Sequence, residues 1–224
     1  MSSGELEPIK EAGEAAAALA DVFIDKTGAA LVPKAYFDYV VTRIHYRHVP
    51  KLIERATATA EKIKASGLPA RAYSAFDDPL LTAILEGNAE EDDPELQKVW
   101  ENLLANALTD GLAPARRAYP VVLRQLEPDE ALMLDRIASG SIIVLGSIGG
   151  TRAFRSKGQD GIPIATLVNL ERLNLIELGH MQPTPAGKPV LAPSDALRVI
   201  RLTPFGASFV EACRPPKRPP EPAR

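Results

Sequence analysis

The clearest repeat of hydrophobic positions lies between residues 93 and 108, where it predicts a helix with one buried face. Its apolar residues recur three and four positions apart, at Leu96, Val99, Trp100, Leu103, Leu104, Ala107 and Leu108. Asp93 is a suitable N-cap, and Pro94 fits the first turn, where no backbone N–H is needed. Trp100 stands in the middle of the stripe, so we expect it to be a structural anchor of the core.

The opposite face of this helix is expected to carry its polar residues, Lys98, Glu101, Asn102 and Thr109. Asn102 and Asn106 are four residues apart and therefore share one side of the helix. They either hydrogen-bond to a neighbouring helix or loop, or form a solvated polar flank. The polar flank is the commoner case and is the expectation.

Similar patterns predict helices before this one. Residues 11–32 form a small-residue helix that Gly28 and Pro33 interrupt or end. Residues 34–66 form a long basic helix, in which Pro50 either makes a kink or starts a second helix, with Ser66-Gly67 as its end. Its inner stripe comprises Phe37, Val40, Val41, Ile44, His48, Leu52, Ala56, Ala60 and Ile63. A short helix is expected over residues 80–87.

The pattern changes after residue 108. Helices are expected near residues 115–125, at 129–138, and again at 163–173 and 205–213. In the helix at 129–138, Leu132, Leu134 and Ile137 face inward. Strands are expected at residues 141–145, 175–178 and 196–202, and the last two can pair. Residues 146–152 are glycine-rich but lack the phosphate-loop spacing, so a flexible loop is expected there.

The fold class is therefore mainly α, with an N-terminal helical bundle or layered helices and a C-terminal winged-helix-like α+β unit. The helical domain is expected over residues 11–125, and the winged-helix-like domain over 126–213, because helix, helix, strand, long loop, strand is the order of such a unit. Residues 1–10 and the basic, proline-rich tail 214–224 are expected to be disordered, although the tail can also serve as a partner's ligand.

Charge changes this picture in one respect. The formal net charge is only −3, but residues 34–71 are rich in Lys and Arg, whereas residues 77–110 are rich in Asp and Glu. We expect these two segments to face one another, within the chain or in a dimer, more than to bind nucleic acid.

Several kinds of chemistry have no readable motif. The single Cys213 excludes a disulfide framework and a cysteine zinc site, and fits a reducing cytoplasm. His45 and His48 lack further ligands, and the acidic run 90–93 lacks the spacing of a calcium loop. With no leader and no apolar run of about 20 residues, we expect a cytoplasmic chain without membrane association. No catalytic, cofactor or metal residue is predicted, so the chain is expected not to be an enzyme.

The candidate contacts to nucleic acid or a partner are the basic residues near the expected C-terminal unit, Arg152, Arg155, Lys157, Arg172 and Lys188. The would-be recognition helix at 163–172 offers a single Arg, whereas phosphate neutralisation usually needs several Lys or Arg on the docking face. Nucleic acid is therefore the weaker expectation.

Several segments together resemble the Abi-alpha (abortive infection alpha) family of bacterial proteins. They cover most of residues 35–213 in the expected order and are Asp92–Gln97, Trp100–Ala107, Leu126–Ala131, Leu170–Ile176, Leu202–Gly206 and Phe209–Cys213. Asn174 departs from the Gly of many winged helices, and the glycine-rich residues 139–161 depart further.

The resemblance implies a cytoplasmic bacterial protein of phage defence and transfers no catalytic residues. Our first hypothesis is a non-enzymatic protein that acts by binding protein, self-association included. The alternatives are a winged-helix DNA-binding regulator and a defence effector that inserts residues 11–49 into a membrane.

Overall fold

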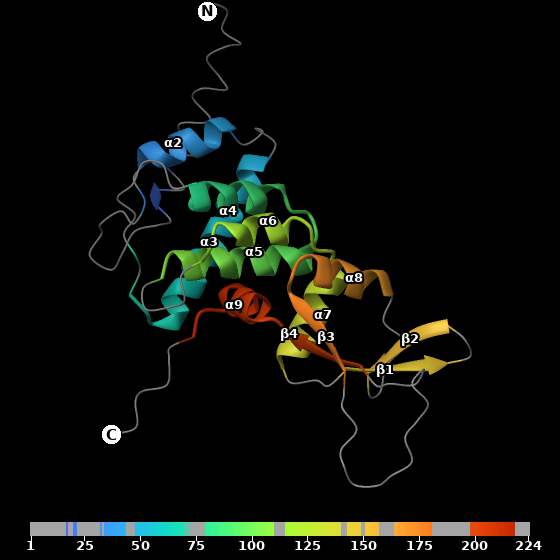
Figure 1. Ribbon diagram of the computed structural model, residues 1–224. Coiled ribbons are helices and arrows are strands. Elements are labelled where there is room, and N and C mark those ends of the chain that lie inside the picture. The colour runs from blue at the N-terminus through green and yellow to red at the C-terminus, as the bar shows by residue number, and fades with distance from the viewer. Residues whose placement is uncertain are drawn as a thin grey trace, which may run out of the picture. The chain divides into compact units, whose positions relative to one another are not determined.

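The computed structural model is mainly helical, as the sequence predicts, and carries one small antiparallel sheet (Figure 1). It describes residues 17, 20, 21, 32, 34–43, 48–69, 71, 79–109, 115–139, 143–148, 151–156, 164–180 and 198–217. The expectations for residues 1–10, most of 11–32 and 218–224 lie outside the described residues. The chain divides into two compact units, Met1–Arg124 with Ala212–Arg224, and Gln125–Glu211.

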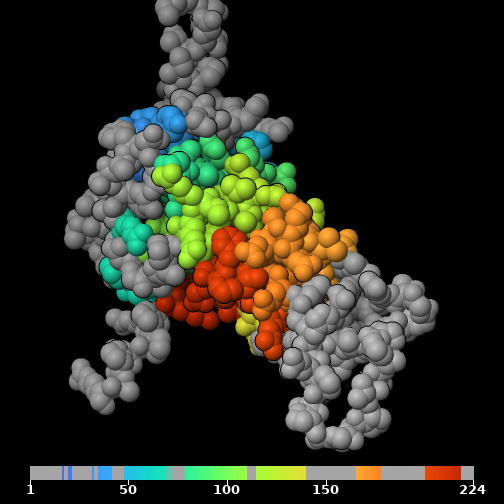
Figure 2. Space-filling view, viewed as in Figure 1, coloured from blue at the N-terminus to red at the C-terminus, as the bar shows by residue number. Residues whose placement is uncertain are grey.

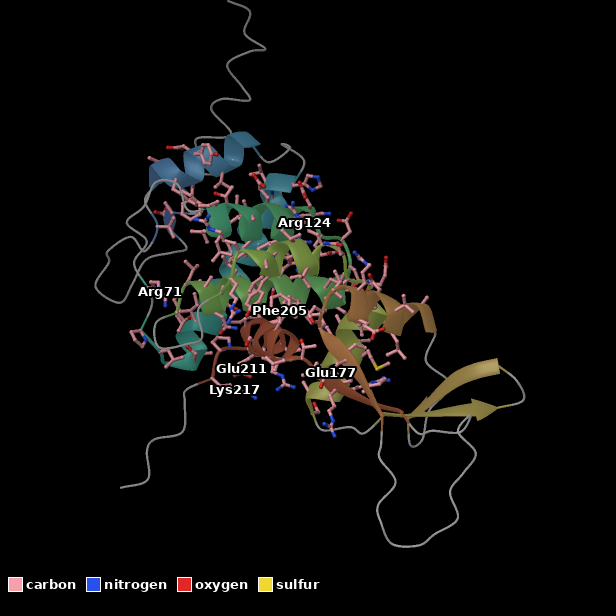
Figure 3. The ribbon with its side chains drawn as sticks, in the orientation of Figure 1. Arg71, Arg124, Glu177, Phe205, Glu211 and Lys217 are labelled. Carbon is pink, nitrogen blue, oxygen red and sulfur yellow. The ribbon has the colours of Figure 1, made fainter. Side chains whose placement is uncertain are left out.

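The described helices of the first unit are α2 (Lys34–Arg43), α3 (Val49–Ser66), α4 (Pro79–Glu90), α5 (Pro94–Ala107) and α6 (Ala118–Leu123). The core forms where α3, α4 and α5 pack on one another. Trp100 of α5 is only 1% exposed and fills the space beside Gly87 of α4. Arg124 ties the end of α6 to α4, with its Nη2 3.4 Å from Glu90 Oε2 (Figure 3).

Of the two alternatives left open at Pro50, a kink or a second helix, the structure has the second helix. α2 ends at Arg43 and α3 begins at Val49, with Pro50 in its first turn, where a proline costs no hydrogen bond. Gly67 ends α3 at a φ of 65°, a left-handed conformation that glycine adopts without steric cost. Every described apolar member of the predicted inner stripe is buried, His48 is half-buried, and Ile44 lies outside the described residues.

Three helix details differ from the prediction. α4 runs through Gly87 to Glu90, because the space of the missing side chain is used for packing and not for a turn. α6 has six residues, shorter than the expected helix of about ten. In α7 (Pro128–Ala138), Leu132 is 47% exposed, and the adjacent Met133 is buried with Leu134 and Ile137.

The second unit contains α7, α8 (Ile164–Arg172) and a four-stranded sheet in the order β2-β1-β4-β3. The strands are β1 (Ile143–Ile148), β2 (Thr151–Ser156), β3 (Ile176–His180) and β4 (Arg198–Leu202). The β3–β4 pairing was expected and is antiparallel. The flexible loop expected at 146–152 is wrong, because β1 and β2 pair antiparallel through Ile148 and Thr151.

The left-handed residue expected at Asn174 is present, with φ 57°. α9 (Pro204–Cys213) follows β4, and its first turn is capped as expected by Thr203, whose Oγ1 accepts from the Gly206 N–H at 2.8 Å. A Cβ at Gly206 would lie 1.9 Å from the Leu175 carbonyl oxygen, so this close approach requires glycine. The boundary between the two units falls inside α9, after Glu211.

Candidate functional site: a polar network on helix α5

The polar side of α5 is buried except at Lys98, which is exposed. Asn102 is 8% exposed, Asn106 5%, Glu101 6% and Thr109 0%. The solvated flank expected from the sequence is therefore wrong. The reason is a segment more than a hundred positions later, which contacts this side of the helix.

Asn102 and Asn106, which we call the asparagine clamp, hold residues 212–214. The Asn102 amide donates to the Cys213 carbonyl at 3.0 Å. The Asn106 amide donates to the carbonyls of Ala212 and Arg214, both at 2.7 Å. The last carbonyls of a helix have no partner within it, so the clamp satisfies the end of α9 with side chains from α5. Residues 212–214 and α5 belong to the same compact unit.

Lys62 of α3 orients one half of the clamp. Its ammonium donates to Asn102 Oδ1 at 2.9 Å and to Glu101 Oε2 at 2.8 Å. An ammonium can only donate, so the Asn102 oxygen faces Lys62 and its amide hydrogens face Cys213. Lys62 thus orients Asn102 for its hydrogen bond to the Cys213 carbonyl, although this bond does not involve Lys62 itself.

The network continues from Glu101 toward the start of α5. Gln97 donates to Glu101 Oε1 at 3.0 Å, and Arg55 lies 3.5 Å from Gln97 Oε1, at the limit of a hydrogen bond. Arg55 also donates to the Glu91 carbonyl. Burial lowers the pKa of the Arg55 guanidinium, and the nearby Glu101 carboxylate opposes that effect.

The predicted meeting of the basic and acidic segments is confirmed within the chain. Lys62 pairs with Glu101, and Lys51 pairs with Asp92 at the connection between α4 and α5. The hydrogen bond from Lys51 lowers the pKa of the exposed Asp92 carboxyl.

Some buried polar side-chain atoms of α3 and α4 have no hydrogen-bond partner. They are both amide atoms of Asn88, which is 0% exposed, and Arg55 Nη1. Glu90 is the α4 residue that faces Arg124 of α6. Asn88 lies about 200° around the helix from Glu90, so the two residues are on opposite sides of α4. An unsatisfied buried amide opposes folding by about 1–3 kcal/mol.

The second unit has a separate polar cluster around Arg172, a predicted contact residue. Its Nη2 donates to Asn169 Oδ1 at 2.7 Å and to Gln125 Oε1 at 3.1 Å. Asn169 in turn donates to Glu130 Oε2 at 2.7 Å. The guanidinium therefore braces α8 against the segment that leads into α7, although Arg172 remains exposed.

The other predicted contact residues are only partly described. Arg152 and Arg155 lie in β2, opposite Ser147 and Val144 of β1. Lys157 and Lys188 lie outside the described residues.

No group of three or more His, Cys, Asp and Glu that can hold a metal ion occurs among the described residues, and His45 lies outside them. Cys213 is buried, and burial raises the pKa of its thiol. In the described segments, no helix combines the length and apolar character needed to cross a membrane.

The sequence missed the role of Lys62 and Glu101, since each has the appearance of an ordinary charged surface residue. The spacing of Asn102 and Asn106 was the available signal for this site. An amide pair on one side of a helix fits a neighbour that presents several carbonyls, but the sequence does not identify that neighbour.

The fold and the clamp define a mainly helical protein in which a central helix holds the chain's own C-terminal segment. The family model of abortive infection alpha matches residues 51–213, so the chain belongs to this family, as its sequence segments suggested. The match runs from Lys51 in α3 to the end of α9. It includes Asn102, Asn106 and the carbonyls of Ala212 and Cys213, but not that of Arg214. No curated protein and no solved structure matches the chain.

Proposed function

We propose that this protein is a non-enzymatic, cytoplasmic component of bacterial phage defence that acts by binding another protein. The family assignment supports the setting, abortive infection. Non-enzymatic action is supported by the use of the polar groups on α5. They hold main-chain carbonyls and each other, and so are not arranged to act on a substrate.

The observation that carries the proposal is the asparagine clamp. Its amide donors bind the backbone carbonyls of a peptide segment. Any partner protein also presents backbone carbonyls. A helical unit built to hold a peptide segment fits a protein-binding role better than a catalytic one.

The test is phage plating on bacteria that carry the gene or lack it. We expect fewer plaques with the gene, and early loss of infected cells at high phage dose. Asn106→Asp, which removes the amide donor of Asn106 and leaves that of Asn102, should change protection while the protein still accumulates. Equal plating with and without the gene would contradict the proposal.

A second candidate is a DNA-binding regulator. We propose that α7, α8, β3 and β4 form a winged-helix-like unit, and Arg152 and Arg155 in β2 supply basic charge near it in sequence. The outward residues of α8 favour this candidate less, because they include Val168, 58% exposed, and Glu171. Salt-dependent binding to duplex DNA, abolished by Ala at positions 152, 155 and 172, would make this the leading function.

A further inference from the structure

The outward side of α6 carries an apolar residue between two arginines. Arg117 and Arg124 flank the helix with φ of −55° and −65°, both in the right-handed helical region. Val121 therefore lies one turn away from each, and the three side chains form a stripe along the helix. All three residues are exposed, Val121 by 58%. The space-filling view shows the yellow-green residues of α6 at the surface of the first unit (Figure 2).

We call Arg117, Val121 and Arg124, with the neighbouring Arg116, the basic stripe. A single exposed valine needs no explanation, but the charge around this one has a single sign. Residues 111–126 contain three arginines and no Asp or Glu. Arg116 and Arg117 are exposed and enter none of the ion pairs formed among the described residues. Their guanidinium groups can therefore bind carboxylates of another molecule.

The same unit exposes the opposite charge next to the stripe. Residues 90–95, which we call the acidic run, contain five Asp or Glu and no Lys or Arg. Arg124 lies 3.4 Å from Glu90, so the basic stripe and the acidic run meet on the surface of one unit (Figure 3). The side chains of Glu90 and Asp92 are 58% and 76% exposed, and each faces its cation, Arg124 or Lys51, through one oxygen. A carboxylate has two acceptor oxygens, so both residues can bind a second cation.

We propose that this surface binds a second copy of the chain, with the basic stripe of each copy against the acidic run of the other. Cyclic dimers are the commonest soluble oligomers, and the same patch on both subunits forms their interface. Such a patch must be complementary to itself. A surface on which a basic stripe adjoins an acidic run, with Val121 as its apolar residue, meets this requirement. The inference goes beyond the proposed function, because self-association does not depend on a role in phage defence.

Arginines also bind the phosphates of nucleic acids, but two observations favour protein. Val121 stands in the middle of the stripe, and an apolar side chain contributes nothing to phosphate contacts. The acidic run beside the stripe would repel a nucleic-acid backbone, whose binding depends on positive charge on the docking surface.

The first experiment is sedimentation velocity of the full chain over a range of protein concentrations. We expect an equilibrium between monomer and dimer. In 1 M salt its dissociation constant should rise by about tenfold or more, because exposed charges are then screened beyond about 3 Å. A monomer at every concentration in low salt would overturn the inference.

The second experiment reverses the charge of one side at a time. One variant combines Arg116→Glu with Arg117→Glu, and the other combines Glu90→Lys with Asp92→Lys. Each alone should dimerise about tenfold more weakly or less tightly still, since like charges then meet across the interface. An equal mixture of the two variants should recover the dimer as a heterodimer, because both contacts are again between opposite charges. A mixture that stays monomeric would overturn the pairing.

The matched control for charge is Lys64→Glu combined with Lys217→Glu. It reverses two exposed cations of the same unit that lie outside the proposed surface. Its dimerisation should equal that of the natural chain, whereas an equal weakening would show that net charge alone decides association and would overturn the inference. Circular dichroism and the midpoint of urea unfolding verify that every variant is folded.

Val121→Ser tests the apolar part of the surface. It should weaken the dimer by about tenfold, because both copies lose the burial of a valine. Val168→Ser is the matched control, since Val168 of α8 is also 58% exposed, and it should change nothing. A dimer that tolerates Val121→Ser would overturn the inference. So would a monomeric chain that binds duplex DNA and loses this binding with Arg116→Glu and Arg117→Glu.

Discussion

Trp100 lies directly against Gly87: a Cβ built on the glycine would stand 2.3 Å from Cη2 of the indole ring. No real side chain tolerates that distance, so the two residues fit only as a pair. Trp100 is 1% exposed and held on all sides, which leaves the ring little freedom to move away.

We therefore expect Gly87→Ala to destabilise the protein, although alanine favours a helix by about 1 kcal/mol over glycine. Overpacking a buried site costs about 1–3 kcal/mol, and this should exceed the gain in helix propensity. Urea unfolding measures the difference. A more stable Gly87→Ala variant would show that α4 and α5 can move apart.

Trp100→Ala should cost about 3–5 kcal/mol, because a large buried side chain leaves a cavity. In the Trp100→Ala background, Gly87→Ala should become neutral or stabilising, since its methyl group now has room. A double-mutant cycle by urea unfolding tests this coupling. Additive effects would mean that the two residues do not share the same space.

Asn88→Leu should stabilise the protein by about 1–3 kcal/mol, because it removes a buried amide that has no hydrogen-bond partner and keeps nearly the same shape. The measurement is again urea unfolding, with Asn88→Asp as the opposite control, expected to destabilise. A loss of stability in Asn88→Leu would mean that the amide is hydrogen-bonded in solution.

Lys62→Met should cost about 1.5–3 kcal/mol, the value of hydrogen bonds to a charged group. It leaves the Glu101 carboxylate, whose side chain is 8% exposed, without its ammonium partner. Adding Glu101→Leu should recover part of the loss, since an apolar pair avoids an unpaired buried charge. Thermal unfolding of the single and double variants measures this recovery. If stability does not recover, the loss in Lys62→Met does not come from the unpaired Glu101 carboxylate.

The Asp92 carboxyl should titrate below its ordinary value of 3.8, because Lys51 stabilises the charged form. A lowered pKa in the folded state adds stability above the unfolded value, and this is lost as pH falls through the folded value. The pH range in which this stability is lost therefore lies below about pH 3.8. Carboxyl titration by NMR in Lys51→Ala should return the pKa of Asp92 toward 3.8, and 1 M salt should do so partly.

Local signals explain which parts of the fold were predictable. Asp93 accepts from the N–H groups of Glu95 and Leu96, as an N-cap should, and the helix it starts has the expected apolar stripe. Asn174 likewise has the expected left-handed conformation at the end of α8, where the Leu175 N–H donates to the Leu170 carbonyl. Such features depend on a few adjacent residues, all visible in the sequence.

The errors have physical reasons of two kinds. The hairpin of β1 and β2 was missed, although Gly149-Gly150 between two strand-like runs is a hairpin signal. The burial of Asn102 and Asn106 had no such local sign, because their partners come from the end of the chain. The boundaries of the two domains and the roles of Arg152 and Arg155 stay predictions.

The order of synthesis gives the asparagine clamp a consequence of its own. Asn102 and Asn106 precede their partners by 111 and 106 residues. At about 5–20 residues per second, the ribosome needs roughly 5–20 s to make the intervening chain. Through that interval α5 carries amide donors that have no partner yet, beside a core that is otherwise complete. A prematurely terminated chain therefore leaves the amides of Asn102 and Asn106 without their carbonyl partners.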